Sequence, residues 1–235
     1  TPECSRKVIL AKQICDMLDE EELAEIPNLS HLTEAEAAMK DYLAEFTFDD
    51  EETGFIGGQA VAEGQSTHTI QNGALYLDGT SSNWLNVTKA DGSSLLTGRD
   101  ELTISFAAKP ESGVSNWMFY TAPNGEAQNL NNENYLGLLE YNGTLTAERY
   151  KNSGTRPASA SAANIDSTNW LYVTIVHTAT KTTLYVNGEK KATQESSIAL
   201  SDILGENSIL QIGKANWGNG EYYKGLIDNL KIMGT

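Results

Sequence analysis

The chain contains few residues with the chemistry of disulfides, metal clusters or histidine catalysis. Its 235 residues include 2 cysteines and 3 histidines. Placed on one helix, Cys4 and Cys15 would lie about 16 Å apart, whereas a disulfide needs Cα atoms within about 7 Å. We therefore expect free, buried thiols. Without a histidine cluster, the two thiols do not form a zinc site.

Long apolar runs and an excess of basic residues are also absent. No run approaches the roughly 18 apolar residues of a membrane span, and residues 8–10 are too short for the apolar core of a signal peptide. Because the chain starts Thr-Pro-Glu, we expect an excised fragment, so the missing signal leaves its location open. Acidic residues outnumber basic ones by 32 to 16, and they gather in residues 16–52. This net charge of −16 disfavours nucleic acid and anionic membranes as partners.

The sequence shows no hydrolase motif. Jelly-roll endoglucanases place paired carboxylates on one strand as E-x-D-x-x-E, whereas Glu140 and Glu148 stand singly. There is no G-x-S-x-G motif, and the three histidines lie in unlike contexts. We therefore expect the chain to lack enzymatic activity.

What is present is a long series of short strand patterns over residues 41–235. Leu102, Ile104 and Phe106 alternate with small or polar residues, which is typical of a half-buried strand. Asn-Gly pairs at positions 72–73 and 187–188 are typical of hairpin turns. A dozen or so such strands, with turns every 8–12 residues, predict an all-β sandwich.

Residues 1–40 have a different period, which predicts a helical appendage. Residues 2–26 read as one helix, and Pro27 and Asn28 break it. A second helix is expected to start at Thr33, where Glu36 completes a capping box. The segment is either a linker folded onto the β-domain or a docking segment for a neighbouring domain.

The closing stretch, residues 226–233, alternates strictly. Leu226, Asp228, Leu230 and Ile232 share one predicted face. Burying the Asp228 carboxylate unpaired would cost several kcal/mol. Asp228 should therefore face a cation or several N–H donors.

These stretches resemble a known family. The closing G-L-I-D-N-L-K-I, the L-Y-V-N-G hairpin and the E-L-T-I-S-F-A-A-K-P strand are similar to motifs of laminin-G-like, concanavalin A-like jelly rolls. The resemblance covers about residues 43–233, with Ala107 at a position where the family often has Trp. It implies a jelly roll of two antiparallel sheets. It also implies an extracellular or cell-surface module of a bacterial glycoside hydrolase or sialidase.

The same resemblance implies a structural calcium ion. The matching positions are Asp49 (or Thr47) on the first strand, Gly73 in an early turn and Asp228 on the last strand. Calcium accepts carboxylate and backbone carbonyl oxygens in irregular loops. The alternative is that Asp228 accepts backbone N–H bonds or pairs with a Lys or Arg.

Sugar binding needs aromatic faces together with amides, carboxylates and arginines. Trp217, between Asn216 and Gly218, is either a stacking platform or a packing residue. The candidate ligand-binding residues are Trp117, Tyr120, Tyr135, Glu140, Tyr141, Arg149, Arg156, Asn216, Trp217 and Tyr222.

The resemblance implies a lectin-like module that binds a glycan without catalysis. Its partners would be an oligo- or polysaccharide and an adjacent catalytic domain in the same chain. Docking would raise the enzyme's effective concentration on its substrate. The alternatives are a protein–protein adhesion module and a structural spacer of a multidomain secreted enzyme.

Overall fold

The computed structural model of the chain describes residues 23, 26–32, 34, 42–58, 60–64, 69–111, 116–125, 134–150, 159–216 and 221–234. The chain divides into two compact units, Thr1–Tyr42 and Leu43–Thr235.

In the first unit, residues 29–32 and 34 are helical and Pro27 and Asn28 form a turn. The predicted break is therefore confirmed, and Asn28 has a φ of 71°. The predicted start at Thr33 is wrong, because residues 29–32 are already helical. The amide N of His31 already donates to the Asn28 carbonyl oxygen over 2.9 Å. The predicted helix over residues 2–26 lies almost entirely outside the described residues, as do Cys4 and Cys15.

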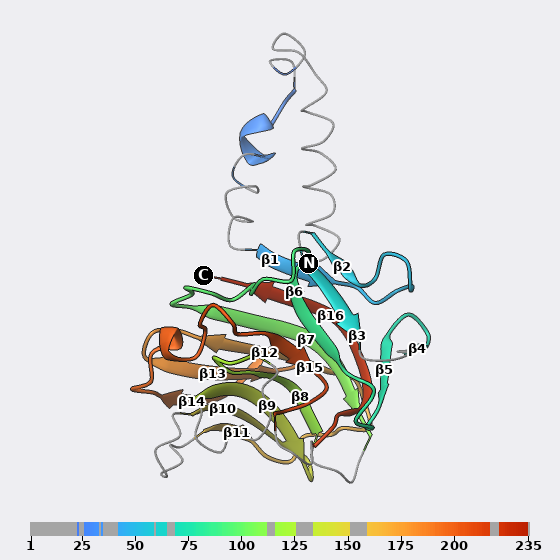
Figure 1. Ribbon diagram of the computed structural model, residues 1–235, viewed down its shortest axis with the longest axis vertical. Coiled ribbons are helices and arrows are strands. Elements are labelled where there is room, and N and C mark those ends of the chain that lie inside the picture. The colour runs from blue at the N-terminus through green and yellow to red at the C-terminus, as the bar shows by residue number, and fades with distance from the viewer. Residues whose placement is uncertain are drawn as a thin grey trace. The chain divides into compact units, whose positions relative to one another are not determined.

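The second unit confirms the predicted sandwich of two antiparallel sheets, as Figure 1 shows. Sheet A runs in the order β14-β13-β12-β7-β16-β5-β4, with β1 also paired to β16. Sheet B runs in the order β11-β10-β9-β8-β15-β6-β3-β2. The strands of sheet A are β1 (Tyr42–Phe46), β4 (Thr69–Ile70), β5 (Leu75–Asp78), β7 (Leu102–Pro110), β12 (Leu171–His177), β13 (Lys181–Val186), β14 (Glu189–Glu195) and β16 (Lys224–Met233). The strands of sheet B are β2 (Ile56–Gly57), β3 (Ala60–Gly64), β6 (Leu85–Lys89), β8 (Asn116–Thr121), β9 (Tyr135–Tyr141), β10 (Thr144–Tyr150), β11 (Ala160–Ala162) and β15 (Leu210–Ile212).

Alternating apolar residues from both sheets fill the space between them. Leu102, Ile104 and Phe106 of β7 are buried as predicted, and Leu136 and Leu138 of β9 belong to the same cluster. Removing such side chains from water is the main stabilising contribution, at about 1.5–3 kcal/mol for each large aliphatic residue. The core is therefore formed by the inner face of each sheet, and the outer face of each sheet lies outside it.

The two predicted Asn-Gly turns are confirmed. Asn72 and Gly73 have φ values of 54° and 73°, and Asn187 and Gly188 have φ values of 53° and 79°. Two consecutive positive φ angles define the turn whose twist matches antiparallel strands. These turns join β4 to β5 and β13 to β14.

Strand β16 departs from the strict alternation predicted for it. Its register against β7 shifts between Asp228 and Lys231, and Asn229 has a φ of 51°. This bulge reverses the alternation, so Ile227, Leu230 and Ile232 all face the core. The prediction that Leu226 shares the core face with Leu230 is wrong for this reason.

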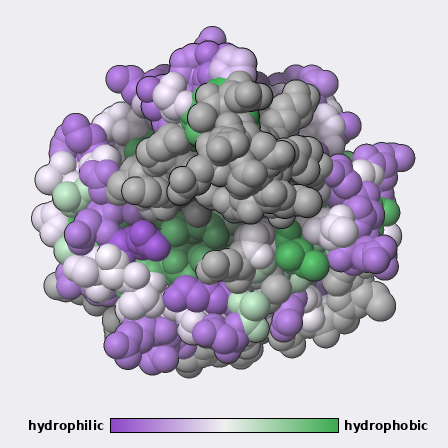
Figure 2. Space-filling view, turned by 90° about the horizontal axis from the view of Figure 1, so that it is seen from above, coloured by the Kyte–Doolittle hydropathy of each residue, from purple (hydrophilic) through white to green (hydrophobic). Residues whose placement is uncertain are grey.

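Seen from above in Figure 2, the described surface is mostly hydrophilic or neutral, with smaller apolar areas. Within the described part of the chain, no helix is both long and apolar enough to cross a membrane.

Candidate carbohydrate-binding site

The outer face of sheet B carries an aromatic cluster that is separate from the core. The cluster consists of Trp117, Tyr120, Tyr135 and Tyr150, and its rings are buried, at 3%, 0%, 5% and 7% exposed. The predicted ligand residues Trp117, Tyr120 and Tyr135 therefore pack against one another and do not present open ring faces to solvent. Tyr120 and Tyr135 stack with their ring centroids 5.2 Å apart, and Tyr150 meets Tyr135 edge-on at 5.2 Å. Trp117 lies edge-on to Tyr120 and Tyr135 at 6.0 and 6.2 Å. These are favoured aromatic geometries.

A bulge in β8 creates this arrangement. The register of β8 against β9 shifts between Trp117 and Phe119, so Met118 and Phe119 both join the main core. Trp117 and Tyr120 then both face outwards. Opposite them stands Gly137, where an added Cβ would lie 2.5 Å from an indole carbon of Trp117. Only glycine lets the indole lie this close to β9.

Buried polar groups lie among the rings. The Tyr135 hydroxyl donates to Glu148 Oε2 over 2.7 Å, and both residues are about 5% exposed. Gln211 pairs in register with Asn86 of β6 on one side and Tyr120 of β8 on the other. Gln211 is fully buried, and neither Oε1 nor Nε2 has a hydrogen-bond partner among the described residues. A buried amide left unpaired is costly, so this site is suited to a polar ligand or water.

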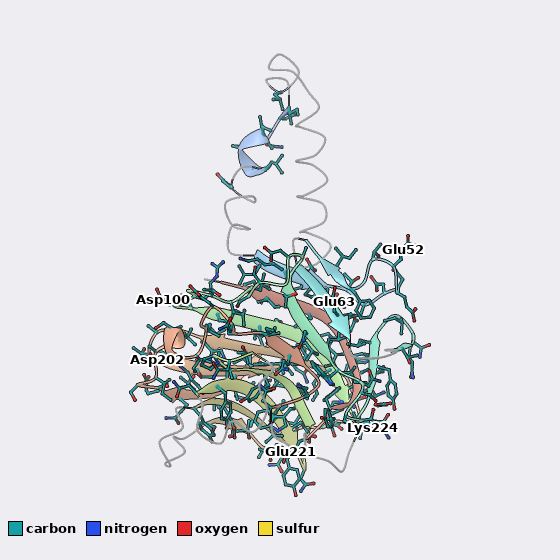
Figure 3. All side chains as sticks on the ribbon, viewed as in Figure 1. Glu52, Glu63, Asp100, Asp202, Glu221 and Lys224 are labelled. Atoms are coloured by element: carbon teal, nitrogen blue, oxygen red, sulfur yellow. The ribbon has the colours of Figure 1, made fainter. Side chains whose placement is uncertain are left out.

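The cluster reaches solvent at one end of the sandwich. The Trp117 Nε1–H donates to Glu221 Oε2 over 2.5 Å, and Trp117 forms a β-bridge with the partly exposed Tyr222. Tyr141 of β9 is 51% exposed. Figure 3 shows Glu221 and Lys224 at this end, far from Glu52 and Asp100. Among the described aromatic residues at this end, Tyr141 and Tyr222 are the two with rings that solvent reaches.

Arg149, predicted to bind ligand, instead joins the two sheets. It has the same parity on β10 as the core residues Leu145 and Ala147, and it is 4% exposed. Its guanidinium donates to the carbonyl oxygens of Thr178 at 2.7 Å, Ala179 at 3.2 Å and Ile198. Burial lowers the pKa of Arg149. This placement contradicts a ligand contact, because the side chain points into the sandwich.

Two further predicted ligand residues hold loops in place. Glu140 is 3% exposed, and its Oε1 accepts the Gly143 N–H over 2.7 Å, which fixes the β9–β10 turn. Asn216 is 1% exposed, and its Nδ2 donates to the Gly125 carbonyl oxygen over 2.6 Å. The predicted residues Arg156 and Trp217 lie outside the described residues.

The sequence did not point to Gln211 or Glu221 as site residues. Gln211 sits between two core residues of the short strand β15, where the alternation Leu-Gln-Ile indicates an outward side chain but not its neighbours. Glu221 precedes Tyr222 in a loop, and no local pattern links it to Trp117, 104 residues earlier.

Of the three predicted calcium positions, Asp49 lies near both Gly73 and Asp228. A Cβ added at Gly73 would lie 3.9 Å from Asp49 Oδ1. Asp228 accepts the N–H and the Nδ2–H of Asn229 over 2.8 and 2.7 Å. Its pKa is nevertheless raised, first by burial and also by the negative charge of Asp49. No group of three or more His, Cys, Asp or Glu side chains in the described ranges could hold a metal ion, so backbone oxygens would have to complete such a site.

Known protein families and solved structures agree with this fold. The family model described as the concanavalin A-like lectin/glucanases superfamily matches residues 78–235. No curated protein matches the chain.

Three solved structures represent the fold. Domain 4 of AbnA, a GH43 extracellular arabinanase from Geobacillus stearothermophilus in complex with arabinotriose, is 17% identical with a TM-score of 0.60, over 83% of this chain and 92% of that one. The Ruminococcus gnavus IT-sialidase CBM40 bound to α2,3-sialyllactose is 16% identical with a TM-score of 0.57, over 69% and 90%. The binding domain of botulinum neurotoxin serotype G is 12% identical with a TM-score of 0.56, over 82% and 47%. At these identities the similarity concerns the fold.

Proposed function

Because the chain belongs to the concanavalin A-like lectin/glucanases superfamily, we propose that it is a non-catalytic carbohydrate-binding module. Its glycan site is the outer face of sheet B, at the exposed ring of Tyr141 and the partly exposed ring of Tyr222, beside the buried Trp117. The observation that carries this proposal is the second, aromatic cluster on the outer face of sheet B, with a buried carboxylate and an amide that has no hydrogen-bond partner within the described ranges.

The composition of this face suits sugars. Aromatic rings stack on the C–H surfaces of a sugar ring, while amide and carboxylate groups bind its hydroxyls. Trp117 pairs in register with Leu139 of β9 and bridges to Tyr222, so Tyr222 lies about 10 Å from β9 across the sheet. An oligosaccharide crossing the strands at this end would reach both exposed tyrosines.

Charge favours neutral glycans over acidic ones. The net charge of −16 repels anions at long range, and the site adds the carboxylates of Glu148 and Glu221. The role as an accessory module follows by proximity. A module that docks on a polysaccharide raises the local concentration of an attached enzyme. We accordingly place the chain outside the cell or on its surface, joined to a glycoside hydrolase.

A glycan array followed by calorimetry on the positive oligosaccharide tests the proposal. Tyr222→Ala should weaken binding at least tenfold, about 1.4 kcal/mol, because one stacking face is lost. Tyr172→Ala is the matched control, because Tyr172 is 64% exposed but lies on β12 in sheet A. Equal losses in both variants would contradict the assigned face. A wild-type chain that binds no glycan but captures a protein ligand would favour adhesion.

We also propose that Asp49, Gly73 and Asp228 hold a structural calcium ion. Asp49 and Asp228 would supply carboxylate oxygens and Gly73 a backbone carbonyl, a donor set that calcium accepts. The raised pKa of Asp228 fits this role, because two neighbouring carboxylates with partial burial are destabilising until a cation neutralises them. The ion would pin the first and last strands of the domain together.

The melting temperatures of the wild type and Asp228→Asn test the metal proposal, because their order should reverse when calcium is added. A carboxylate whose folded pKa is raised lowers stability at pH values above that pKa. Without calcium, Asp228→Asn should therefore melt at a higher temperature than the wild type. With calcium, only the wild type should gain stability. A wild-type melting temperature that changes with neither chelator nor calcium would contradict the metal proposal.

A further inference from the structure

A cavity of about 240 Å³ lies at the rim of the sandwich. It forms where the loop between β11 and β12 meets the turn between β13 and β14. Its floor is Leu171 and Val186, which are buried. Trp170, which is partly exposed, forms one wall. Its polar lining consists of Asn164, Asp166, Asn169, Asn187 and Lys191.

Hydrogen bonds hold these walls in place. Asp166 accepts the N–H of Thr168 at 3.0 Å and the Nδ2–H of Asn169 at 2.9 Å. Asn187 is fixed to β12, since its Oδ1 accepts the Tyr172 N–H at 2.9 Å and its N–H donates to the Tyr172 carbonyl oxygen at 2.8 Å. The lining is therefore preorganised, which lowers the entropic cost of binding.

Both charges at the cavity are already compensated. The Asp166 carboxylate accepts three hydrogen bonds from Thr168 and Asn169, and the Lys191 ammonium lies 2.6 Å from Glu189 Oε2. A charged ligand would have to displace one of these partners. A neutral ligand would instead meet Trp170 and three asparagines, and an aromatic residue beside amides is the chemistry that recognises hydroxyl groups beside C–H surfaces.

We propose that this cavity is a second binding site, for one neutral sugar residue stacked against Trp170. Pockets for drug-sized ligands measure about 300–1,000 Å³, so a 240 Å³ cavity matches a single residue rather than an oligosaccharide. The ligand class rests on the proposed function. The site itself is distinct, because none of its lining residues belongs to the aromatic cluster.

The cavity also borders the exposed end of the outer face. The Ile165 N–H donates to the Gly143 carbonyl oxygen over 2.8 Å, so a lining residue is tied to the turn that follows Tyr141. Two sites on one rigid domain give an avidity that neither gives alone.

Fluorine NMR on the full chain labelled with 5-fluorotryptophan tests the proposal. The 4 tryptophans give separate resonances, and Trp170→Phe assigns the one from the cavity. The probes are arabinotriose, xylotriose, cellotriose and lactose, with N-acetylneuraminic acid as the charged comparison. We expect at least one neutral sugar to shift the Trp170 resonance saturably in the millimolar range, and the acid to leave it unmoved.

Two variants separate this site from the first. Asn169→Ala should weaken the Trp170 response roughly tenfold and leave the Trp117 response intact, while Tyr222→Ala should do the reverse. A Trp170 resonance that no neutral sugar moves, with Trp117 still responding, would overturn the second site alone. A Trp170 response lost in Tyr222→Ala, or stronger for the acid, would also overturn it. If neither tryptophan responds to any sugar, both proposals fail.

Discussion

Replacing Arg149 by methionine removes the guanidinium that links β10 of sheet B to the β12–β13 turn of sheet A. The substitution keeps most of the apolar stem and deletes three hydrogen bonds, to the carbonyl oxygens of Thr178, Ala179 and Ile198. A hydrogen bond from a charged donor contributes about 1.5–3 kcal/mol, so the simple sum is about 4.5–9 kcal/mol. The cost of burying the cation, seen in its lowered pKa, offsets part of that sum. Each buried carbonyl oxygen that is left without its donor costs about 1–3 kcal/mol.

We therefore expect Arg149→Met to lose about 3–5 kcal/mol of unfolding free energy, a large share of the roughly 5–15 kcal/mol available. For a domain of this size the melting temperature should fall by about 10 °C. Urea unfolding followed by tryptophan fluorescence measures the first quantity and calorimetry the second.

The matched control is Lys181→Met, which removes an exposed cation whose partner Glu195 lies 4.0 Å away. Such a surface pair contributes about 0–1 kcal/mol. Arg149→Lys should fall between the two, because an ammonium cannot reach three carbonyls in the same fork geometry. If Arg149→Met loses less than about 1 kcal/mol, or weakens glycan binding per folded molecule as strongly as Tyr222→Ala, the structural role assigned to Arg149 is wrong.

Two further changes probe the core and the site. Burial lowers the pKa of His177 to about 3 from the usual 6.5, so its contribution to stability is complete above pH 6.5 and is lost as the pH falls towards 3. Over this range His177 lowers the free energy of unfolding by at most about 1.4 kcal/mol per pH unit. His177→Gln should flatten that acid limb in urea titrations at a series of pH values, and an unchanged limb would refute the assignment. Gly137→Ala would bring a Cβ within 2.5 Å of the Trp117 indole, so it should destabilise the domain by about 1–3 kcal/mol and weaken glycan binding. Calorimetry showing wild-type stability and affinity would refute the close packing.

The strands were predictable because their signals are local. Leu102, Ile104 and Phe106 alternate without interruption. The Asn72-Gly73 pair favours a two-residue hairpin turn, because both residues tolerate a positive φ. The β16 bulge was not predictable, because Asn229 adopts a positive φ that no neighbouring residue requires. The error at Leu226 follows from this single extra residue.

The sequence predicted which residue types form the candidate site, but it did not predict how they are arranged in space. The aromatic residues of β8 and β9 were identified, but the β8 bulge decided that Trp117 and Tyr120 share a face. The inward orientation of Arg149 could have been predicted, because it lies two and four residues after the core residues Ala147 and Leu145 on the same strand. The amide of Gln211 matters only because Asn86 and Tyr120 flank it across two strands, which no local pattern reveals.

The most direct measurement is an amide chemical-shift map of the labelled chain titrated with its best-binding neutral oligosaccharide. We expect the largest shifts on β8, β9, β10 and residues 221–223, with a second, weaker group at residues 164–171. Shifts concentrated on β12, β13 and β16 instead, or a titration that moves no resonance at all, would contradict carbohydrate binding on the outer face of sheet B.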